Sequence, residues 1–511
     1  MVWPSVVLAC DAALTCYSAA IALLLFSPFK SRLMRRSVRR SLTLLTTLVC
    51  LLALVAGVLL YALQDRGIAP RMLGPYLERR SSGHNWLIEH VGAWTATALT
   101  GQDREAASPQ PLPASAIGAR RSLDASSGAT VVLVASADEA RAAIARAQPG
   151  EAITFLPGSY RFDGASIRVT RAGRAQAPIA VRAAVAGTVL LEFALEEGFS
   201  VSAPWWRFEN LTIRGACKAH SDCEHAFHVS GGAHHFAAIN NTISDFNAHF
   251  KINGAAGRFP DFGTIEHNTL NNGSARQTIN PVTPIDLVAA SGWTIRANLI
   301  SDFVKADGNR VSYGAFAKGG GSANQFVGNI VICERLLTGQ PGQRIAISLG
   351  GGATEAAYCR DRKCITEQSG STIESNLISA CSDDGIYLNS AANSRIVHNT
   401  LLDTGGIDVR FPTSSAHVAG NLVDGAIRAR NGGLLRQGDN LDTATAWLYL
   451  GWHPQQSLFK APAQLGLRWA GATPRRAAGA AASDLCGAVR PAAPAYGAFE
   501  DFAACLAQAG R

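Results

Sequence analysis

Most of the second half of this 511-residue sequence lacks the apolar period of 3.6 residues that amphipathic helices need, which argues against a helical array. The glycine runs at 319–321 and 350–352 lack a following Gly-Lys-Ser pattern or helix start, which argues against a phosphate-binding loop. The two apolar stretches near the N-terminus lack a small-residue cleavage site. We therefore expect these stretches to be membrane anchors and not a removed signal peptide.

What the second half does contain is a recurring asparagine that precedes Ile, Leu or Val by one or two residues. The intervals range from 22 residues (399 to 421) to 47 residues (329 to 376), which suits one coil of a parallel β-solenoid with loops of variable length. Stacked coils bring equivalent residues about 4.8 Å apart, so buried asparagines can form a ladder of amide hydrogen bonds. The repeat predicts an all-β solenoid whose ladder residues are Asn210, Asn241, Asn268, Asn298, Asn329, Asn376, Asn399 and Asn421.

The two N-terminal apolar stretches, at 2–26 and 42–63, are each long enough to cross a hydrocarbon core of about 30 Å. Asp11 lies inside the first stretch, where a carboxylate is costly. A short basic loop between two membrane spans stays on the cytoplasmic side, so the remainder of the chain is expected to face outward. This loop supplies most of the net charge of +8, which is therefore no indication of nucleic-acid binding; its cations are Lys30, Arg32, Arg35, Arg36, Arg39 and Arg40.

The sequence therefore divides into four expected regions. Residues 1–64 form two transmembrane helices with a basic cytoplasmic loop. Residues 65–128 form a juxtamembrane segment that rests on the membrane surface, followed by a flexible linker. Residues 129–440 form the parallel β-helix, which begins with a helical cap at 137–147, and residues 441–511 form a C-terminal strand or cap region. We expect an inner-membrane protein whose C-terminal domain is periplasmic.

Cysteine usage agrees with export. Three cysteines fall in the apolar stretches, and the other eight form an even number compatible with disulfides in an oxidising compartment. The pairs closest in sequence are Cys217 with Cys223, Cys359 with Cys364 and Cys486 with Cys505, which leaves Cys333 and Cys381 about one coil apart; spacing alone leaves the connectivity open. The alternative is a zinc site in one loop that contains Cys217, His220, Cys223, Glu224, His225 and His228.

A second repeat lies one strand before each of these asparagines. In this strand, apolar residues alternate with one position whose residue type varies from coil to coil. Because side chains alternate between the two faces of a strand, the variable residues should point outward in a row. Cations and carboxylates at steps of about 4.8 Å suit a linear acidic ligand such as a uronic-acid polysaccharide. The alternative is a solvated face whose charges pair across coils, as Asp286 would with Lys251 or Lys318. The row reads His228, Lys251, Asp286, Lys318 within one position, Ser348, Tyr387, Asp408 and Arg428, and two residues later Asn253, Asn389, Arg410 and Arg430.

Two early segments carry a family resemblance. Gly-Glu-Ala-Ile-Thr-Phe-Leu-Pro-Gly-Ser-Tyr at 150–160 and Ala-Gln-Ala-Pro-Ile-Ala-Val-Arg at 175–182 resemble the opening coils of the chondroitinase B and alginate lyase family of polysaccharide lyases. The resemblance implies a right-handed parallel β-helix and an acidic polysaccharide as partner. Residues 484–487, Arg490 and residues 497–500 resemble the closing segment of secreted β-helix proteins, in which a short strand returns along the solenoid.

The same resemblance implies roles for individual residues. The family's base is a lysine in a strand motif followed by an asparagine, as in the segment 314–324, so Lys318 is the expected base. β-Elimination at a uronate also needs its carboxylate neutralised and a proton for the leaving oxygen. We expect Lys251 and Arg410 to engage carboxylates and Asp286 to orient a lysine. The expected substrate contacts are His228, Tyr387, Asp384, Asp408 and Arg428.

The sequence departs from the family at two places. Where family members carry an arginine in the next coil, this chain has Ile-Ser-Leu-Gly-Gly-Gly at 347–352, and Arg344 is displaced. The two acidic calcium ligands expected shortly before the lysine are replaced by Val311 and Tyr313. We therefore expect no metal site and assign no cofactor. Calcium remains a candidate only because of the family resemblance.

Other activities remain open. Ser382-Asp383-Asp384-Gly385 resembles the paired aspartates of polygalacturonase β-helices, which would make Asp383 and Asp384 general acid and base of a glycoside hydrolase. The His-Gly and Arg-x-Lys motifs that should follow this pair are absent. A noncatalytic glycan-binding or polysaccharide-assembly protein would use the same outward row, and a structural spacer would use none of it. The expected partners are an acidic polysaccharide and the membrane, not nucleic acid.

Overall fold

The computed structural model describes residues 34–104, 117–120, 129–351, 354–477 and 483–507, and the chain divides into two compact units at residue 68. In the first unit, helix α2 (Met34–Asp65) contains a 23-residue stretch, Thr43–Asp65, with a mean hydropathy of 2.6, long and apolar enough to cross a membrane. The first predicted span and its Asp11 lie outside the described residues. Arg35, Arg36, Arg39 and Arg40, which were expected in a loop, belong to α2.

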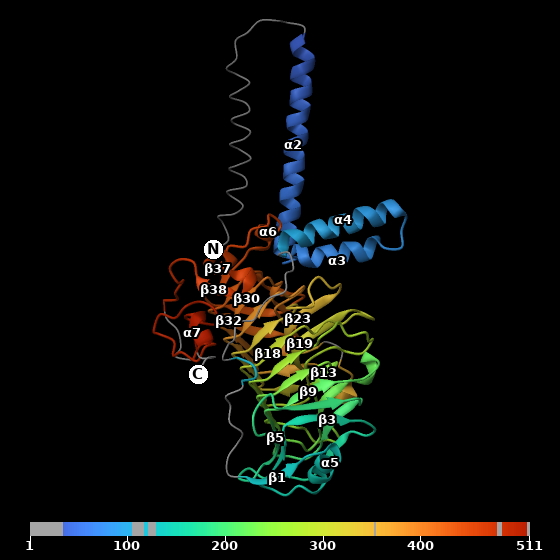
Figure 1. The fold of residues 1–511 in the computed structure, drawn as a ribbon. Helices are drawn as coiled ribbons and strands as arrows, with labels where there is room; N and C mark the ends of the chain where they lie inside the picture. Colours follow the sequence, from blue (N-terminus) through green and yellow to red (C-terminus); the bar gives the residue numbers. More distant parts are fainter. Residues whose placement is uncertain (1–33, 105–116, 121–128, 352–353, 478–482, 508–511) are drawn as a thin grey trace. The chain divides into compact units, whose positions relative to one another are not determined.

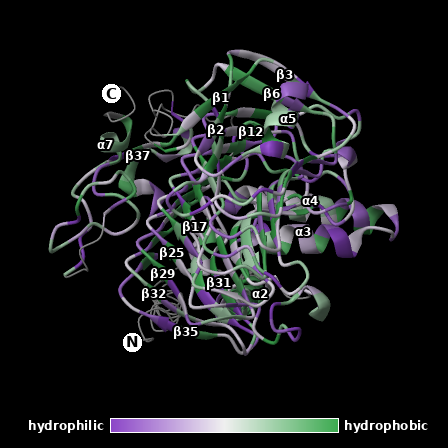
Figure 2. Cartoon of the chain, turned by 90° about the horizontal axis from the view of Figure 1, so that it is seen from below, coloured by the Kyte–Doolittle hydropathy of each residue, from purple (hydrophilic) through white to green (hydrophobic). Residues whose placement is uncertain are grey.

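The second unit contains a right-handed parallel β-helix, as the repeat predicted (Figure 1). Each full coil adds one strand to each of three long parallel sheets, which we call A, B and C. Figure 2 shows hydrophobic residues along these strands.

Sheet A consists of β1 (Thr130–Val134), β2 (Glu151–Phe155), β5 (Ile179–Ala183), β8 (Trp206–Glu209), β11 (Ala237–Ile239), β14 (Thr264–Glu266), β17 (Thr294–Arg296), β21 (Gln325–Val327), β25 (Thr372–Glu374), β29 (Ser394–Val397), β32 (Ser415–Ala419) and β35 (Leu434–Gln437). Sheet B consists of β3 (Gly158–Phe162), β6 (Val189–Phe193), β9 (Thr212–Gly215), β12 (Thr242–Ser244), β15 (Thr269–Asn271), β18 (Leu299–Ser301), β22 (Ile330–Ile332), β26 (Leu377–Ser379), β30 (Thr400–Leu402), β33 (Leu422–Val423) and β36 (Leu441–Asp442).

Sheet C consists of β4 (Ile167–Val169), β7 (Glu197–Val201), β10 (His225–Ser230), β13 (Ala248–Asn253), β16 (Ile285–Val288), β19 (Val311–Lys318), β23 (Gln343–Leu349), β27 (Ile386–Asn389), β31 (Gly406–Arg410) and β34 (Ala426–Arg430). A short parallel sheet holds β20 (Gly321–Ser322), β24 (Gln368–Ser369) and β28 (Ala391–Ala392), and β37 (Phe459–Ala461) pairs antiparallel with β38 (Gly466–Trp469).

The interior repeats with the coils. Phe199, Phe227 and Phe250 occupy equivalent positions on three neighbouring strands of sheet C and stack with ring centroids 5.1 and 5.2 Å apart. These separations are close to the spacing of about 4.8 Å between hydrogen-bonded strands, so identical side chains pack face to face along the axis. The periodic core therefore keeps successive coils in the same register.

A ladder of buried asparagines runs along the corner between sheets A and B. From Asn241 onward, each side-chain amide nitrogen donates to the side-chain oxygen of the asparagine one coil later, at 2.9–3.0 Å. The same oxygen also accepts the preceding asparagine's backbone N–H, as Asn376 does from Asn329 at 2.9 Å. Each amide therefore satisfies backbone and side-chain groups that would otherwise be buried without partners.

The ladder differs from the predicted one at both ends. Asn210 lies one position early, at a left-handed corner (φ 60°), and its side-chain oxygen accepts from Asn240 (2.6 Å). The ladder begins at Asn241 and ends at Asn440, which the repeat did not include. Asparagine tolerates the left-handed conformation, so the same residue type occupies both the corner and the ladder position beside it.

We expect Asn329→Ala to destabilise the β-helix by about 1–3 kcal/mol, because Asn298 and the neighbouring backbone would lose buried partners. Urea unfolding of the detergent-solubilised chain, followed by circular dichroism, measures the change. The exposed Gln325→Ala, on strand β21, serves as control and should change stability by less than about 0.5 kcal/mol. Equal stability of the two variants would contradict a structural role for the ladder.

Both ends of the β-helix are covered. Helix α5 (Ala137–Arg146) begins at Ser136, whose hydroxyl accepts from the Glu139 backbone, and it packs on the first strands. After β36 come α6 (Thr445–Leu448), β37, β38 and α7 (Phe502–Ala507), with short 3₁₀ helices at Gln456–Leu458 and Pro462–Gln464. Before α7 the chain runs back along sheet B, where Gly497 and Ala498 donate backbone hydrogen bonds to Gly420 and Thr400.

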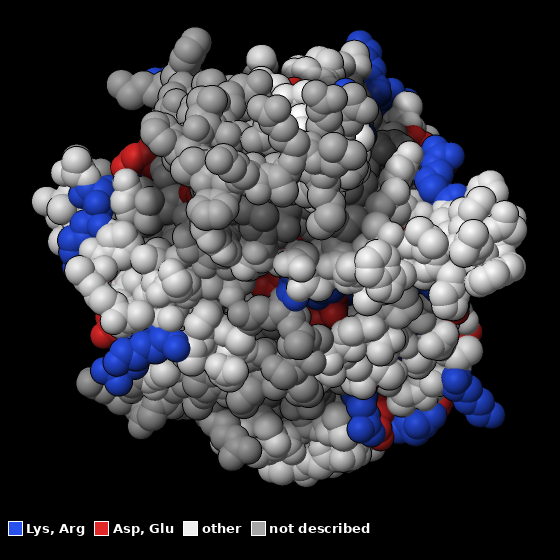
Figure 3. Space-filling view, turned by 90° about the horizontal axis from the view of Figure 1, so that it is seen from above, with Lys and Arg blue, Asp and Glu red and all other residues white. Residues whose placement is uncertain are grey.

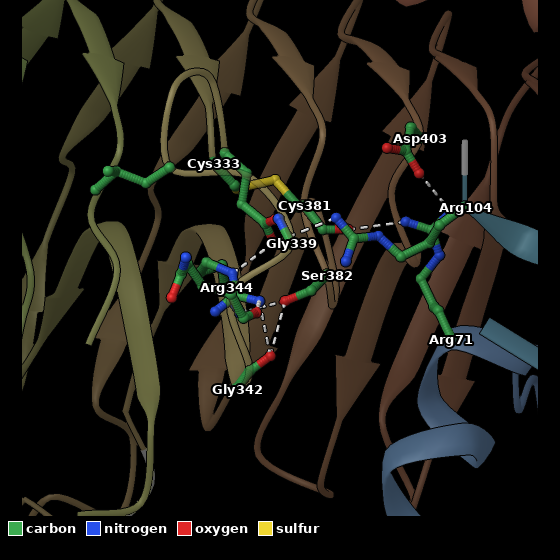
Figure 4. A network of polar contacts seen from close by, with 12 residues as sticks. Arg71, Arg104, Cys333, Gly339, Gly342, Arg344, Cys381, Ser382 and Asp403 are labelled. Atoms are coloured by element: carbon green, nitrogen blue, oxygen red, sulfur yellow. Dashed lines mark hydrogen bonds and ion pairs between the residues drawn. A yellow bond between two sulfur atoms is a disulfide. The ribbon is translucent and has the colours of Figure 1, made fainter. Parts of the chain in front are cut away.

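A helical hairpin precedes the β-helix and is fixed to it by buried ion pairs. In α3 (Pro70–Ser81), Arg71 bonds Asp103 at the end of α4 (Trp86–Asp103), Asp403, and the Cys381 carbonyl, at 2.8–2.9 Å (Figure 4). Arg104 pairs with Glu334 at 3.2 Å. One side of this hairpin, which was expected to rest on the membrane surface, therefore packs against the β-helix.

Further along, residues 117–120, expected within the flexible linker, also contact the β-helix. The Arg120 backbone donates to Asn240, and the Gly118 backbone donates to the Ala297 carbonyl at 2.9 Å. In α4, Trp86 and Trp94 are 75% and 72% exposed. Figure 2 shows both hydrophobic and hydrophilic residues along α3 and α4.

The disulfide expectation is confirmed. All four suggested pairs form: Cys217 with Cys223, Cys333 with Cys381, Cys359 with Cys364, and Cys486 with Cys505. The Cys333–Cys381 bond joins successive coils. Because Cys217 and Cys223 are oxidised, neither can supply the thiolate that the alternative zinc site required.

His453 gives the fold a pH dependence. Burial lowers the pKa of its imidazole, but the hydrogen bond and charge of Asp424, 2.9 Å away, more than offset this and raise it to about 9. Since the folded pKa exceeds the unfolded value of about 6.5, the stabilisation is complete below that value and is lost as the pH rises through 9. His453→Gln should therefore lower unfolding free energy by about 1–3 kcal/mol at pH 6 and by much less at pH 10. A loss of equal size at both pH values would contradict this coupling.

Candidate functional site on the outer face of sheet C

The outer face of sheet C carries two lines of side chains. In the first line the strand register aligns His228, Lys251, Asp286, Phe316, Ser348, Tyr387, Asp408 and Arg428. Two residues further along each strand, the second line contains Asn253, Val288, Lys318, Asn389, Arg410 and Arg430. The predicted alignment was therefore wrong for Lys318, which lies two positions away from Asp286 because Phe316 occupies that place.

At the start of these lines, Lys251 and Asp286 form an ion pair of 2.7 Å across neighbouring coils. In the preceding coils, Glu197 accepts a hydrogen bond from His228 (2.6 Å), and the Nδ1 atom of His225 lies 3.8 Å from the same carboxylate oxygen. The two imidazoles next to the carboxylate, His225 and His228, hold the Glu197 pKa far below its usual range. Burial lowers the His228 pKa, but Glu197 more than offsets this and raises it.

The middle of the face is apolar and aromatic. Val288, Ala289 and Phe316 form a small buried cluster, with Phe259 and Tyr313 packed against it. The Lys318 ammonium lies 4.6 Å from the Phe316 ring centre, a cation–π contact that suits the charged amine. A Cβ atom at Gly351 would lie 2.6 Å from Lys318 Cδ, so any larger residue here would push the lysine side chain aside.

Further along, three donors converge. The Tyr387 hydroxyl oxygen accepts from Asn389 (3.2 Å) and from Arg410 (3.4 Å). Burial raises the Tyr387 pKa, although Arg410 opposes the shift, so the hydroxyl stays protonated at neutral pH. Because both neighbours donate to the tyrosine oxygen, the hydroxyl hydrogen remains able to donate to a ligand.

Next to these donors lies a group of buried charges. Asp384 pairs with Arg428 at 2.5 Å, and Asp408 pairs with Arg430. Burial raises the pKa of Asp383 and Asp384, although Arg428 opposes both shifts. Asp384 and Arg428 are 3% and 6% exposed, and Met72 of α3 contacts the Arg428 guanidinium at 3.5 Å. These predicted contact residues are therefore largely engaged with one another.

Lys318 and Arg410 differ from these paired charges. Within the described residues, neither forms an ion pair with a carboxylate. The Arg410 guanidinium donates to the Tyr387 hydroxyl and lies over the Phe411 ring. Its Nε atom is buried without a hydrogen-bond partner in the described part of the chain. Figure 3 shows another face of the molecule, on which basic and acidic side chains are interspersed.

Arg344, which the sequence singled out, lies elsewhere, and Glu197, which it did not, belongs to the face. Arg344, considered as a displaced substitute for the family's arginine, is buried against Glu334 at 2.6 Å and holds the carbonyls of a turn (Figure 4). In contrast, Glu197 was not predicted, because it lies one coil before His225 in a segment without a motif. Only its alignment with His225 on the neighbouring strand could have indicated it.

Fold and face together define the class of the protein as a parallel β-helix with a polar and aromatic outer sheet. No family model and no curated protein matches the chain. Among solved structures, pectate lyase Pel9A matches with 14% identity and a TM-score of 0.47, covering 70% of this chain and 90% of that one. An alginate lyase from Paenibacillus sp. str. FPU-7 matches with 15% identity and a TM-score of 0.35, covering 60% and 98%. A rhamnogalacturonan lyase matches with 12% identity and a TM-score of 0.40, covering 57% and 77%.

We expect Arg428→Met to destabilise the fold by about 3–5 kcal/mol, because the buried Asp384 and Asp408 would lose a compensating charge. The double variant Arg428→Met/Asp384→Leu should recover part of this loss, which chemical unfolding would show. The exposed Arg436→Met is the control and should change little. Additive effects in the double variant would contradict direct coupling between Arg428 and Asp384.

Proposed function

We propose that the protein binds an acidic polysaccharide along the outer face of sheet C. The observation that carries this proposal is the pair of cations, Lys318 and Arg410, that lack a carboxylate partner among the described residues while the neighbouring arginines are paired. A cation held at a partly buried position without a counter-ion attracts an anionic ligand. Uronate carboxylates supply such groups at regular intervals along a polymer.

The spacing of the two cations suits a polymer better than a small anion. Lys318 is on β19 and Arg410 is on β31, and β23 and β27 lie between them. Three strand steps of about 4.8 Å place the two backbone positions about 14 Å apart. Tyr387, on β27 between them, offers a hydrogen-bond donor, and the half-buried Tyr313 of β19 offers aromatic surface to a sugar ring. Lys251, oriented by Asp286, extends the line toward the first coils.

On the bound polymer, Lys318 acts as base in a lyase-like β-elimination. Its amine, once neutral, takes the proton from carbon five of a uronate, and a double bond forms between carbons four and five as the bond from carbon four to the glycosidic oxygen breaks. The lysine ammonium formed in this way then gives the proton to that oxygen. Arg410 and Lys251 hold uronate carboxylates, which stabilises the negative charge that develops there. This assignment of Lys318 rests on the strand motif and on its place beside the aromatic cluster. A noncatalytic glycan-binding protein would use the same cations without turnover.

The candidate span Thr43–Asp65 supports attachment to a membrane, and four disulfides support an oxidising compartment. We place the β-helix on the periplasmic side of an inner membrane. The exposed Trp86 and Trp94 of α4 are residue types that favour the interface between membrane and water.

The test is binding of the detergent-solubilised chain to a panel of polyuronates and neutral polysaccharides. Lys318→Ala and Arg410→Ala should each weaken polyuronate binding at least tenfold, which corresponds to about 1.4 kcal/mol, and added salt should weaken binding further. Arg436→Ala, on sheet A, is the matched control and should leave affinity unchanged. Polyuronate affinity that is indifferent to both Lys318 and Arg410 would contradict the proposed face.

Analysis of the reaction products distinguishes a lyase from a hydrolase and from a noncatalytic binding protein. A lyase yields unsaturated uronate ends that absorb ultraviolet light, and Lys318→Ala should abolish them. Saturated reducing ends that disappear in Asp383→Asn or Asp384→Asn would indicate the hydrolase alternative instead. Binding without either product across the panel would favour the noncatalytic glycan-binding protein.

A further inference from the structure

From the first coils of sheet C we infer a second site, for a divalent transition-metal ion such as Zn²⁺, formed by Glu197, His225 and His228. One potential ligand atom from each residue lies within 4.8 Å of the other two. The inference is independent of the polysaccharide proposal, since it concerns other side chains and another ligand.

The ligand atoms point toward one place. Nδ1 of His228 lies 2.6 Å and Nδ1 of His225 lies 3.8 Å from the same Glu197 oxygen. In a tetrahedral zinc site with bonds of about 2.0–2.1 Å, ligand atoms are about 3.4 Å apart. Small side-chain rotations that lengthen the distance from His228 to Glu197 and shorten the distance from His225 to Glu197 are enough to admit the ion. Two imidazoles and one carboxylate form a recurring zinc ligand set, with a water molecule as fourth ligand.

Two further observations favour a metal over a simple ion pair. Nε2 of His228 lies 2.8 Å from the Asn253 side-chain oxygen, so Nε2 keeps its hydrogen while a metal ion replaces the hydrogen that Nδ1 donates to Glu197. Metal-bound histidines characteristically donate their other N–H to such an oxygen. Nδ1 of His225 is buried and has no hydrogen-bond partner among the described residues, although it faces the carboxylate.

The register explains why these groups meet. His225 lies directly opposite Glu197 on the neighbouring strand, and His228 lies opposite Lys251. A metal here would link β7 to β10 and would add positive charge beside Lys251. The disulfide Cys217–Cys223 closes the preceding loop, so the ligand set contains no thiolate.

The site can be tested on the full detergent-solubilised chain after removal of metals with a chelator. Isothermal titration with ZnCl₂ should show binding that Glu197→Gln or His225→Gln weakens at least a hundredfold. Asn253→Ala should weaken it by about 10–100-fold, because that residue only orients His228. His417→Gln, which removes an exposed imidazole on sheet A, is the control and should have no effect.

Cobalt identifies the ligands independently. The Co²⁺-loaded chain should show visible d–d bands without the thiolate charge-transfer band that a cysteine-bound ion gives, and Glu197→Gln should remove the d–d bands. Zinc affinity that is the same in the wild type, Glu197→Gln and His225→Gln would overturn the assignment. So would the absence of zinc binding in the micromolar range by the wild-type chain.

Discussion

The structure depends on the fixed register between successive coils. A left-handed residue turns the chain at the corner before each ladder asparagine from Asn241 to Asn421, and each of these asparagines bonds to the equivalent residue of the next coil. The phenylalanine stack imposes the same repeat from inside. Because the coils cannot slip relative to one another, residues far apart in sequence occupy fixed neighbouring positions on sheet C.

This register aligns residues from successive coils into lines of side chains on the outer face of sheet C. Charges that face each other across coils neutralise one another, as Lys251 does with Asp286 and Arg430 with Asp408. Lys318 and Arg410 lie on the same face, and neither has a carboxylate partner among the described residues. The face is therefore a mixture of paired charges, which mainly keep the sheet intact, and unpaired cations that are available to a ligand.

The helical hairpin adds a second constraint. Arg71 is completely buried between Asp103 and Asp403, and Met72 beside it covers Arg428. The hairpin therefore shields the last coils of sheet C, whereas Lys318 and Arg410 remain partly exposed.

The sequence predicted the β-helix because a repeated coil leaves a repeated residue in the chain. It also suggested all four disulfides. It misplaced Lys318, since the eight-residue strand β19 offers two alternative alignments, and it read Asn210 as a ladder residue although it occupies the corner. The burial of Arg428 could not be predicted, because Met72, which contacts it, is more than 300 residues away. Glu197 was missed because only strand pairing brings it to His225.

The most direct measurement is an experimental structure of the chain with a bound oligouronate. The oligosaccharide should lie along the outer face of sheet C, with its carboxylates on Lys318 and Arg410. An oligouronate bound on sheet A or sheet B, with Lys318 and Arg410 free of contacts to it, would contradict the account.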